Sequence, residues 1–417
     1  MVYAQTLFLL WLKGHHVGVK KPRRVKHSFL IYNNTYGNPH NHNNENHHPM
    51  TNRTKYNIFL FISTFARNLV EVFISLILFK NGFPLSSILQ FYLLGTLFSI
   101  PVSYFFVRIG ERFNYSIIMC VGIVAFVALQ LALNAVTENT FFIISTALLY
   151  SLYKRGYWVA RRYYVTEVIP QKNSTKPFSI MMVISEIASI LAGFLGGSLL
   201  DGLNASILTI ISSVLLLISI IPLLRIQNKT KKTKIELIKN LKKYDKRNIL
   251  AFSLYEINNI LTFLFPIFIT IYAKDTYMMA GAVNAISSLA IILFILFYGR
   301  IIKKRNYFVL SSILFVLICF AKLFFLDYLI LILCFIEGFI KKMQEQSVSK
   351  IYFENRNNVD SAHHNLIYQI IEALARVIVT VPLLFMSDVR MMISFVLIVI
   401  SVEIAIYACL RKNQKLS

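Results

Sequence analysis

Residues 225–247 read RIQNKTKKTKIELIKNLKKYDKR, a strongly basic segment that interrupts an otherwise apolar chain. The segment holds ten Lys or Arg residues, and its only acids are Glu236 and Asp245. Six apolar stretches long enough to cross a bilayer as helices precede it, and six more follow it. This pattern predicts an integral membrane protein built from two halves.

The composition of the whole chain supports the same interpretation. Of its 417 residues, 56% are hydrophobic and only 15% are charged, whereas soluble proteins are about a quarter charged. The net charge of +24 lies mostly in short loops, as membrane orientation requires, so we expect a lipid bilayer and no nucleic acid as partner. The four cysteines lie in apolar stretches at unrelated spacings, and we expect neither a metal site nor a cofactor.

The predicted organisation has four parts. Residues 1–49 form an Asn- and His-rich tail, which is either disordered or upstream sequence before a true start at Met50, and a His-rich tract can also bind metal. Residues 50–224 form a first bundle of six helices, residues 225–247 a cytoplasmic linker, and residues 248–417 a second bundle of six helices. Residues 234–243 of the linker have the spacing of an amphipathic surface helix, which could bind anionic lipid, although a plain connecting segment is the favoured interpretation.

The twelve spans alternate with loops of very different charge. In the first half they cover residues 57–79, 85–107, 116–136, 140–166, 178–200 and 204–224. In the second half they cover residues 248–272, 277–299, 307–325, 327–351, 365–386 and 390–410. Lys and Arg gather in every second loop and at both ends, so both termini are predicted to be cytoplasmic. The bias toward Lys, Asn and Ile is typical of an AT-rich bacterial genome and indicates the plasma (inner) membrane.

Charged residues inside the spans are the sharpest functional signal. Each costs at least about 2.5–3.5 kcal/mol at the bilayer centre unless it faces the protein interior or water. Six cations and six anions fall at mid-depth: Arg67, Glu71, Lys154, Arg155, Glu186, Glu256, Glu337, Lys341, Lys342, Glu345, Glu372 and Arg376. Arg161 and Arg162 lie nearer the cytoplasmic end of their span, and Glu403 receives no role.

Four pairs of these charges are four residues apart and share a helix face. They are Arg67/Glu71, Glu337/Lys341, Lys341/Glu345 and Glu372/Arg376. Each pair either neutralises itself and holds helices together or takes part in function. Lys154 and Arg155 have no acid three or four positions away. They therefore pair with acids on other helices, contact water, or bind an anionic substrate, which a guanidinium binds through two hydrogen bonds and an ammonium as a point charge.

The buried charges also repeat along the chain. A shift of 186 residues places Arg155 on Lys341 and Glu186 on Glu372, and a shift of 185 places Glu71 on Glu256. Matching charges at matching depth in two six-span halves indicate an internal repeat.

This layout resembles the major facilitator superfamily over roughly residues 55–412. In that family helices 1, 4, 7 and 10 of twelve line a central cavity, and the deep charges fall on these four helices and on helices 5 and 11. The loop after the second span retains Arg108, Gly110 and Arg112 of the family's gating-loop motif, but Val107 replaces its Asp, and in the repeated segment 299–306 Lys303 does so.

A second element of the family is present in altered form. Residues 192–197, AGFLGG, are similar to the glycine-rich element of the family's antiporters, with Ala192 and Gly193 where Gly-Pro is usual. Small residues also serve ordinary close packing of membrane helices, so the antiporter interpretation and the packing interpretation both stay open.

The resemblance implies an all-α membrane fold of twelve helices in two pseudo-symmetric bundles. It implies a secondary active transporter, not an enzyme, that works as a monomer, moves a small organic solute by alternating access and is coupled to protons. The expected substrate-binding residues are Arg67, Lys154, Arg155, Tyr157, Asn259, Lys341 and Lys342. The expected proton-coupling residues are Glu186, Glu256 and Glu372, because a carboxylic acid in a low-dielectric cavity can exchange protons near neutral pH.

Two other classes of function compete with this one. A transporter-like sensor or scaffold that moves no solute fits the altered loop motifs. A membrane-bound transferase requires a nucleophile or a base, yet outside the tail the only histidines are His363 and His364 at the start of one span.

Overall fold

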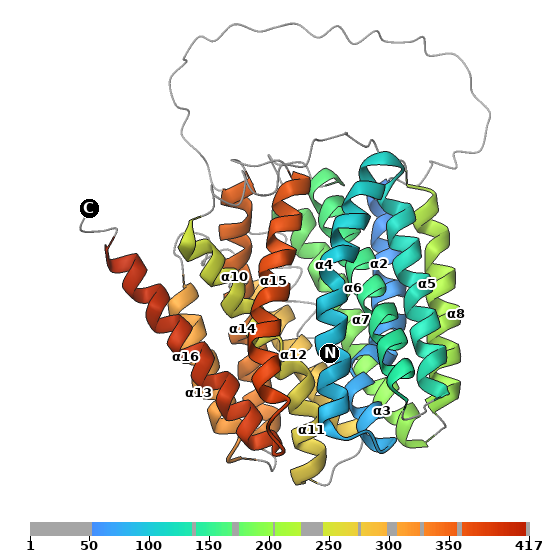
Figure 1. The fold of residues 1–417 in the computed structure, drawn as a ribbon. Helices are drawn as coiled ribbons and strands as arrows, with labels where there is room; N and C mark the ends of the chain where they lie inside the picture. Colours follow the sequence, from blue (N-terminus) through green and yellow to red (C-terminus); the bar gives the residue numbers. More distant parts are fainter. Residues whose placement is uncertain are drawn as a thin grey trace, which may run out of the picture. The chain divides into compact units, whose positions relative to one another are not determined.

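The computed structural model describes residues 52–135, 139–168, 175–202, 205–226, 245–273, 277–297, 307–325, 329–356 and 361–413. The elements in these ranges are helices that stand side by side (Figure 1). Counting each broken span as one, they make twelve helices in two bundles of six, which confirms the predicted fold class.

The helices of each bundle follow the predicted spans closely. The first bundle consists of α2 (Asn52–Glu71) continued by α3 (Ile74–Lys80), α4 (Leu85–Arg112), α5 (Tyr115–Asn134), α6 (Thr140–Val168), α7 (Thr175–Gly202) and α8 (Ala205–Leu224). The second consists of α10 (Lys246–Asn258) continued by α11 (Leu261–Ala273), α12 (Tyr277–Phe297), α13 (Phe308–Lys322), α14 (Leu329–Arg356), α15 (Ser361–Leu383) and α16 (Val389–Asn413). Residues 1–51 and 227–244 lie outside the described residues, so the tail and the linker helix stay predictions.

The linker ends where α10 begins. The carboxylate of Asp245 accepts a hydrogen bond from the backbone N–H of Arg247 at 3.0 Å and so caps the helix. The Arg247 guanidinium also donates to this carboxylate, and this hydrogen bond lowers the pKa of Asp245.

The same helix pairings occur in both bundles. In the first, α2 packs against α7 and α8; in the second, α10 packs against α15 and α16. Likewise α6 packs against α4 and α5, as α14 packs against α12 and α13, and α5 contacts α8 as α13 contacts α16. The internal repeat inferred from buried charges is therefore a repeat of helix packing.

The first helix of each bundle is broken beside a buried carboxylate. The sequence predicts single spans here, but α2 stops at Glu71 and α10 stops two residues after Glu256. At the breaks the backbone N–H groups of Phe73 and Ile260 bond to carbonyls three residues earlier, at 2.9 and 3.0 Å. These tighter turns interrupt the α-helical ladder without a proline and mark corresponding points of the repeat.

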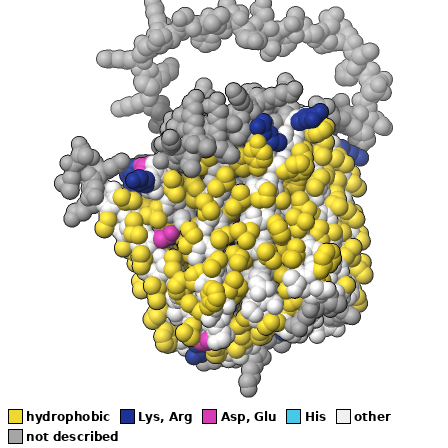
Figure 2. Space-filling model, viewed as in Figure 1, with side chains coloured by type: hydrophobic (Ala, Val, Ile, Leu, Met, Phe, Trp, Pro, Cys, Tyr) yellow, Lys and Arg dark blue, Asp and Glu magenta, His cyan; other side chains and the backbone are white. Residues whose placement is uncertain are grey.

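The outer faces of the bundles are apolar. Among the described residues, nine helices are long and apolar enough to cross a membrane, with the broken ones counted whole. Hydrophobic side chains cover most of the face in Figure 2, and the described Lys and Arg residues gather mainly at its upper margin. Large side chains such as Phe105, Phe297 and Ile378 are exposed on these faces, as contact with lipid requires.

The two bundles touch mainly through α7 against α12 and α4 against α15. We call the end at which α8 stops and α10 begins the basic end, and the end at which α7 stops and α12 begins the opposite end. At the opposite end both carboxylate oxygens of Asp201 accept backbone N–H bonds from the start of α12, from Tyr277 at 3.0 Å and Met278 at 2.8 Å. Phe73 packs edge-on against Tyr277, and the Lys80 ammonium lies 3.7 Å from the same ring.

Candidate functional site

A cavity of about 380 Å³ lies between the two bundles, in the half of the molecule nearer the basic end. Both bundles supply its walls, from α2, α6 and α7 on one side and α10, α14 and α15 on the other. The lining residues are Thr64, Arg67, Asn68, Trp158, Arg161, Arg162, Met181, Met182, Ser185, Glu186, Ser189, Tyr255, Glu345, Val348, Ser349 and Tyr368. The lining thus combines charged, polar, aromatic and apolar side chains.

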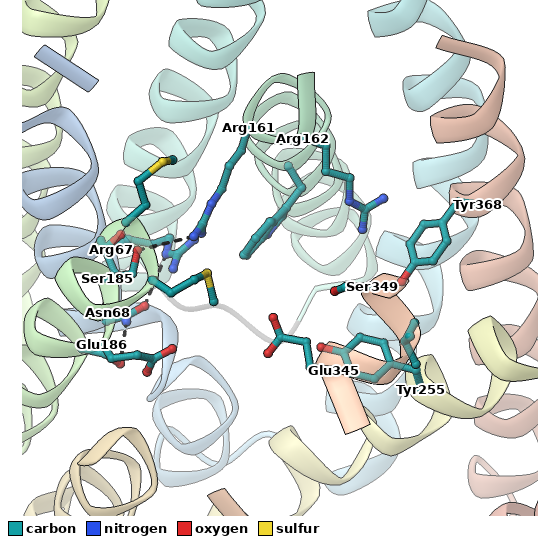
Figure 3. Close-up of a pocket in the computed structure, with 16 residues that line it drawn as sticks. Arg67, Asn68, Arg161, Arg162, Ser185, Glu186, Tyr255, Glu345, Ser349 and Tyr368 are labelled. Atoms are coloured by element: carbon teal, nitrogen blue, oxygen red, sulfur yellow. Dashed lines mark hydrogen bonds between the residues drawn. The ribbon is translucent and has the colours of Figure 1, made fainter. Parts of the chain in front are cut away.

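The first-bundle wall is an interlinked polar surface. Asn68 accepts a hydrogen bond from Arg67 at 3.3 Å and donates one to Ser189 at 2.9 Å, which joins α2 to α7. Arg161 donates to Ser185 at 3.4 Å, which joins α6 to α7. Figure 3 shows these side chains grouped on one side of the cavity, with Glu186 beneath them.

The second-bundle wall carries two tyrosines and a carboxylate. Glu345 on α14 forms an ion pair with Lys342 at 2.9 Å, so its charge is neutralised from its own helix. Arg162 comes from α6 but reaches across, and its guanidinium lies 4.4 Å from the ring of Tyr368 (Figure 3). Tyr255 completes this wall beside Glu345.

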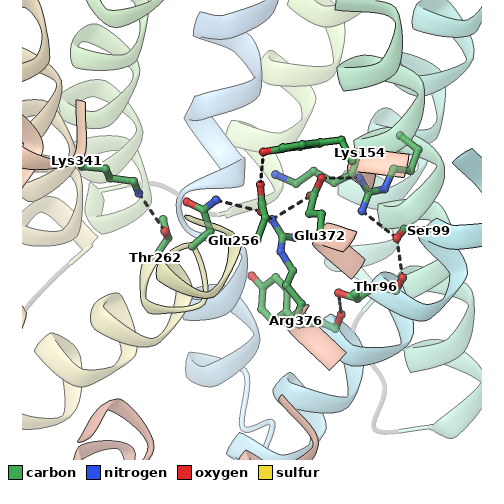
Figure 4. A network of polar contacts seen from close by, with 12 residues as sticks. Thr96, Ser99, Lys154, Glu256, Thr262, Lys341, Glu372 and Arg376 are labelled. Atoms are coloured by element: carbon green, nitrogen blue, oxygen red, sulfur yellow. Dashed lines mark hydrogen bonds and ion pairs between the residues drawn. The ribbon is translucent and has the colours of Figure 1, made fainter. Parts of the chain in front are cut away.

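A chain of ion pairs joins the bundles beside the cavity (Figure 4). Arg155 on α6 binds Glu372 on α15 at 3.0 Å and Ser99 on α4 at 2.9 Å. Glu372 also pairs with Arg376 at 3.2 Å and more loosely with Arg162 at 3.7 Å. These buried charges therefore fasten α4, α6 and α15 together across the junction.

This series of ion pairs extends further into the second bundle through Glu256. Its carboxylate accepts bonds from Arg376 at 2.6 Å, from Tyr368 at 3.1 Å and from Asn259 at 3.2 Å. Glu256 and Asn259 flank the break between α10 and α11, so the broken helix is held by this contact.

A second cluster lies within the first bundle, at the break between α2 and α3. Glu71 forms ion pairs with Arg67 at 2.9 Å and with Lys154, and it accepts a hydrogen bond from Tyr153 at 2.6 Å. Arg67 also lies 4.9 Å from the ring of Tyr157. Two cations thus share one carboxylate here.

The structure divides the predicted site residues into two groups. Arg67 and Glu186 line the cavity. The remaining members of the predicted substrate and proton sets lie outside its lining: Lys154, Arg155, Tyr157, Asn259, Lys341, Lys342, Glu256 and Glu372. Lys154 and Arg155 both form ion pairs with residues of other helices, which is one of the three alternatives that the sequence left open. Binding roles for all of them stay predictions.

Of the four pairs of charges four residues apart, two form ion pairs and two do not. Arg67/Glu71 and Glu372/Arg376 are ion pairs. Glu337 instead pairs with Lys322 of α13 at 2.6 Å, and Glu345 pairs with Lys342, three residues away. Lys341 donates to Thr262 at 3.3 Å. The helix face alone does not decide a partner, because cations on neighbouring helices compete for the carboxylate.

The gating-loop residues lie at the basic end of α4. Arg108 donates to the Tyr104 hydroxyl at 3.3 Å, and Arg112 lies 5.6 Å from the ring of Phe113. A Cβ on Gly110 would come within 2.6 Å of the Tyr115 ring, so the glycine allows close packing of the loop. Val107 is buried, which explains why an apolar residue is tolerated where the family has Asp. Segment 299–306 lies outside the described residues, and a gating role stays a prediction.

The glycine-rich element of α7 is a packing surface. A Cβ on Gly281 of α12 would lie 2.1 Å from the carbonyl oxygen of Gly193, and one on Gly197 would lie 2.8 Å from the backbone of Met278. Gly196 packs in the same way against Leu69 of α2. Close helix packing therefore accounts for these glycines, without reference to antiport.

Sequence reasoning missed several residues of the cavity. The sequence places Arg161 and Arg162 near the cytoplasmic end of their span and suggests Glu345 only as a partner of Lys341. Nothing in the sequence marks Asn68 and Ser185 as functional residues, because they are uncharged. Arg161 and Trp158 are three residues apart and share a helix face, but only their side-chain contacts in the structure show that this face meets Arg67 of α2 and Ser185 of α7.

Comparisons with known proteins agree with this geometry. The model of the Major Facilitator Superfamily matches residues 57–343. A crystal structure of a mutant of the nucleoside transporter NupG is similar, with a TM-score of 0.66 and 12% identity over 86% of this chain and 99% of that chain. A bacterial homologue of the iron transporter ferroportin in an inward-facing state is similar too, with a TM-score of 0.64 and 11% identity over 86% and 98%. At such identities the likeness concerns the fold. None of the curated proteins matches the sequence.

Proposed function

Because the chain belongs to the Major Facilitator Superfamily, we propose that it is a secondary active transporter that moves a small organic solute across the membrane by alternating access. The family and the fold are those of multi-pass membrane transporters. Solute class, proton coupling, a monomeric state and residence in the plasma (inner) membrane are parts of the proposal.

The observation that carries this proposal is the cavity at the junction of the bundles. Each bundle supplies one wall, so a rocking of one bundle against the other changes which end of the cavity is closed. A solute held between the walls would be released on the side that opens.

The contacts between the bundles favour an arrangement open toward the basic end. At the opposite end α7 and α12 touch backbone to backbone at Gly193 and Gly281, and Asp201 caps α12. The cavity lies on the other side of these contacts, among the residues of α6, α7 and α14 nearer the basic end. With the basic end in the cytoplasm, this arrangement is inward-facing.

Glu186 is the best placed of the three predicted proton sites. Among the described residues, Glu372 is paired with Arg155, Arg162 and Arg376, and Glu256 with Arg376. Glu186 occupies the position equivalent to Glu372 in the repeat and lines the cavity, yet no ion pair to it occurs within the described residues. A carboxylate without a fixed counter-ion can gain and lose a proton without breaking the interface.

The test is a flux assay in proteoliposomes that contain a pH-sensitive dye. Organic solutes of differing charge are added outside, and both solute uptake and internal pH are followed. We expect at least one solute to enter together with protons, and Glu186→Gln to abolish the proton movement. Glu403→Gln is the matched control, because Glu403 is a carboxylate within α16 that bonds to Ser253 at 2.9 Å and is not part of the cavity lining.

The outcomes separate the parts of the proposal. Solute uptake without proton movement would retain transport and exclude coupling through Glu186. Solute binding with no uptake for any compound would favour the alternative, a transporter-like sensor or scaffold. The observation behind that alternative is the buried Val107, since the Asp that the family's gating loop uses is absent.

A further inference from the structure

We infer that the cavity binds a small organic anion with a single negative charge, whose carboxylate is held by Arg67 and Arg161. This inference rests on the proposed function and names the class of solute. It differs from the expectation drawn from the sequence, in which Lys154 and Arg155 were the residues for an anion.

Arg67 has hydrogen-bonding capacity left over. Its side chain is buried, and its Nε lies 2.9 Å from a carboxylate oxygen of Glu71 and donates a hydrogen bond to Asn68 at 3.3 Å. Its Nη1 has no hydrogen-bond partner among the described residues. A buried donor without an acceptor is costly, and a guanidinium binds a carboxylate oxygen more strongly than a neutral one. An anionic group at this wall would therefore complete the site.

Arg161 supplies a charge without a fixed carboxylate. Within the described part of the chain its contacts are the Ser185 hydroxyl at 3.4 Å and the ring of Trp158 at 4.8 Å, and it forms no ion pair. The Arg67 guanidinium lies 5.4 Å from the same Trp158 ring. Both guanidinium groups thus lie against one side chain at the cavity wall, and the inference places the ligand's carboxylate beside them.

The balance of charge on this wall indicates a monovalent anion. The lining of this wall carries two cations, Arg67 and Arg161, and one carboxylate, Glu186, while outside the lining Glu71 is balanced by Lys154. One positive charge remains for the ligand to neutralise. On the other wall the Glu345 charge is already neutralised by Lys342, so that wall presents no free anion for a cationic solute.

The rest of the lining indicates which kind of organic group carries the carboxylate. Met181, Met182 and Val348 provide an apolar surface, and Tyr255 and Tyr368 provide aromatic rings with polar tips. Thioether side chains adapt to irregular apolar shapes. A carboxylate joined to an aromatic or branched aliphatic body fits such a cavity, since most small-molecule sites combine an apolar body pocket with a few polar anchors.

The chain provides its own reporter for a binding test. It contains two tryptophans, Trp11 in the tail and Trp158 in the cavity wall, so Trp11→Phe leaves a single fluorophore beside the proposed site. The probes are a panel of aromatic and branched aliphatic carboxylates, each with its matched amide and amine of the same body. We expect carboxylates to change Trp158 fluorescence saturably, and the amides and amines to require at least tenfold higher concentration.

Three variants locate the binding. Arg161→Gln breaks no ion pair among the described residues and is expected to weaken carboxylate binding at least tenfold. Arg67→Gln should do the same; it also removes a partner of Glu71, so Arg161→Gln decides the test if Arg67→Gln does not fold. Arg53→Gln is the matched control, an exposed arginine at the start of α2, and should leave affinity unchanged.

The inference is overturned if no carboxylate of the panel binds, if amides bind as tightly as carboxylates, or if Arg161→Gln leaves the affinity unchanged. The assay uses purified protein without a gradient. Carboxylate binding without flux would therefore contradict the transport proposal alone, whereas flux of a neutral solute would contradict this inference alone.

Discussion

The function of a buried charge in this protein depends on its partners more than on its position along the helix. Glu186 and Glu372 are equivalent in the repeat, and both are glutamates on helices that flank the junction. Glu372 holds three arginines, while Glu186 faces the cavity without an ion pair among the described residues. One therefore serves the interface, and the other is available for the solute or a proton.

This difference predicts unequal effects of the same substitution. Glu372→Gln removes the only ion-pair partner that the buried Arg155 has among the described residues, and breaking such a pair costs about 3–5 kcal/mol. Arg376 keeps its ion pair with Glu256. Glu186→Gln breaks no ion pair and should cost less than about 1 kcal/mol. Thermal unfolding of the purified variants in detergent should show a large fall in Tm for Glu372→Gln only. Equal Tm values for the two variants would show that the bridge does not stabilise the junction.

At the scale of elements, small residues decide how closely the bundles approach. The contact between α7 and α12 is made where Gly193 and Gly281 meet backbone to backbone, so neither position has room for a side chain. The contact lies at the opposite end, and the cavity begins on its other side. In the proposed transport cycle, this close packing would keep that end shut.

Substitution of Gly281 by Val is expected to weaken this closure. The added Cβ would lie 2.1 Å from the Gly193 carbonyl oxygen, so the two helices must separate. A Ser189→Cys reporter in the cavity wall, in a background without the four native cysteines, should then react several-fold faster with a membrane-impermeant thiol reagent applied at the opposite end. Gly202→Ala is the control, since nothing lies within 4 Å of its Cβ position. An unchanged labelling rate in Gly281→Val would mean that the closure lies elsewhere.

At the scale of the whole molecule, the two bundles share one packing scheme, and the basic segments of both lie at the same end. Helix ends at the basic end carry the Lys- and Arg-rich segments, and the opposite end carries few cations. In the proposed orientation, with the basic loops in the cytoplasm, the cavity in this arrangement would face inward.

Cysteine labelling of intact cells tests this orientation. In the background without native cysteines, Asn81→Cys and Phe385→Cys lie at turns of the opposite end and are expected to react with an impermeant thiol reagent applied outside. Arg112→Cys, at the basic end of α4, should react only after the membrane is permeabilised. The reverse pattern would place the basic end outside and make the cavity outward-facing.

The fold could be predicted from the sequence to a large extent, because the membrane restricts the choices. Backbone groups in hydrocarbon must bond within their own helix, so twelve apolar stretches predict twelve helices, and the spacing of buried charges predicts the repeat. The breaks after Glu71 and near Glu256 were not predicted, since no proline marks them and short-range turns leave no clear pattern.

The sequence by itself determined the class of protein, the number of spans, the internal repeat and the presence of charges that must be buried. Only the tertiary structure decided which charge meets which. Lys154 and Arg155 have no acid within reach on their own helix. Packing brings Glu71 to Lys154 and Glu372 to Arg155, so both cations form ion pairs outside the cavity lining. Packing also places Arg161 at the cavity wall. Ion pairing acts over a few ångströms, and only the folded structure brings helices that are far apart in the chain to such short distances.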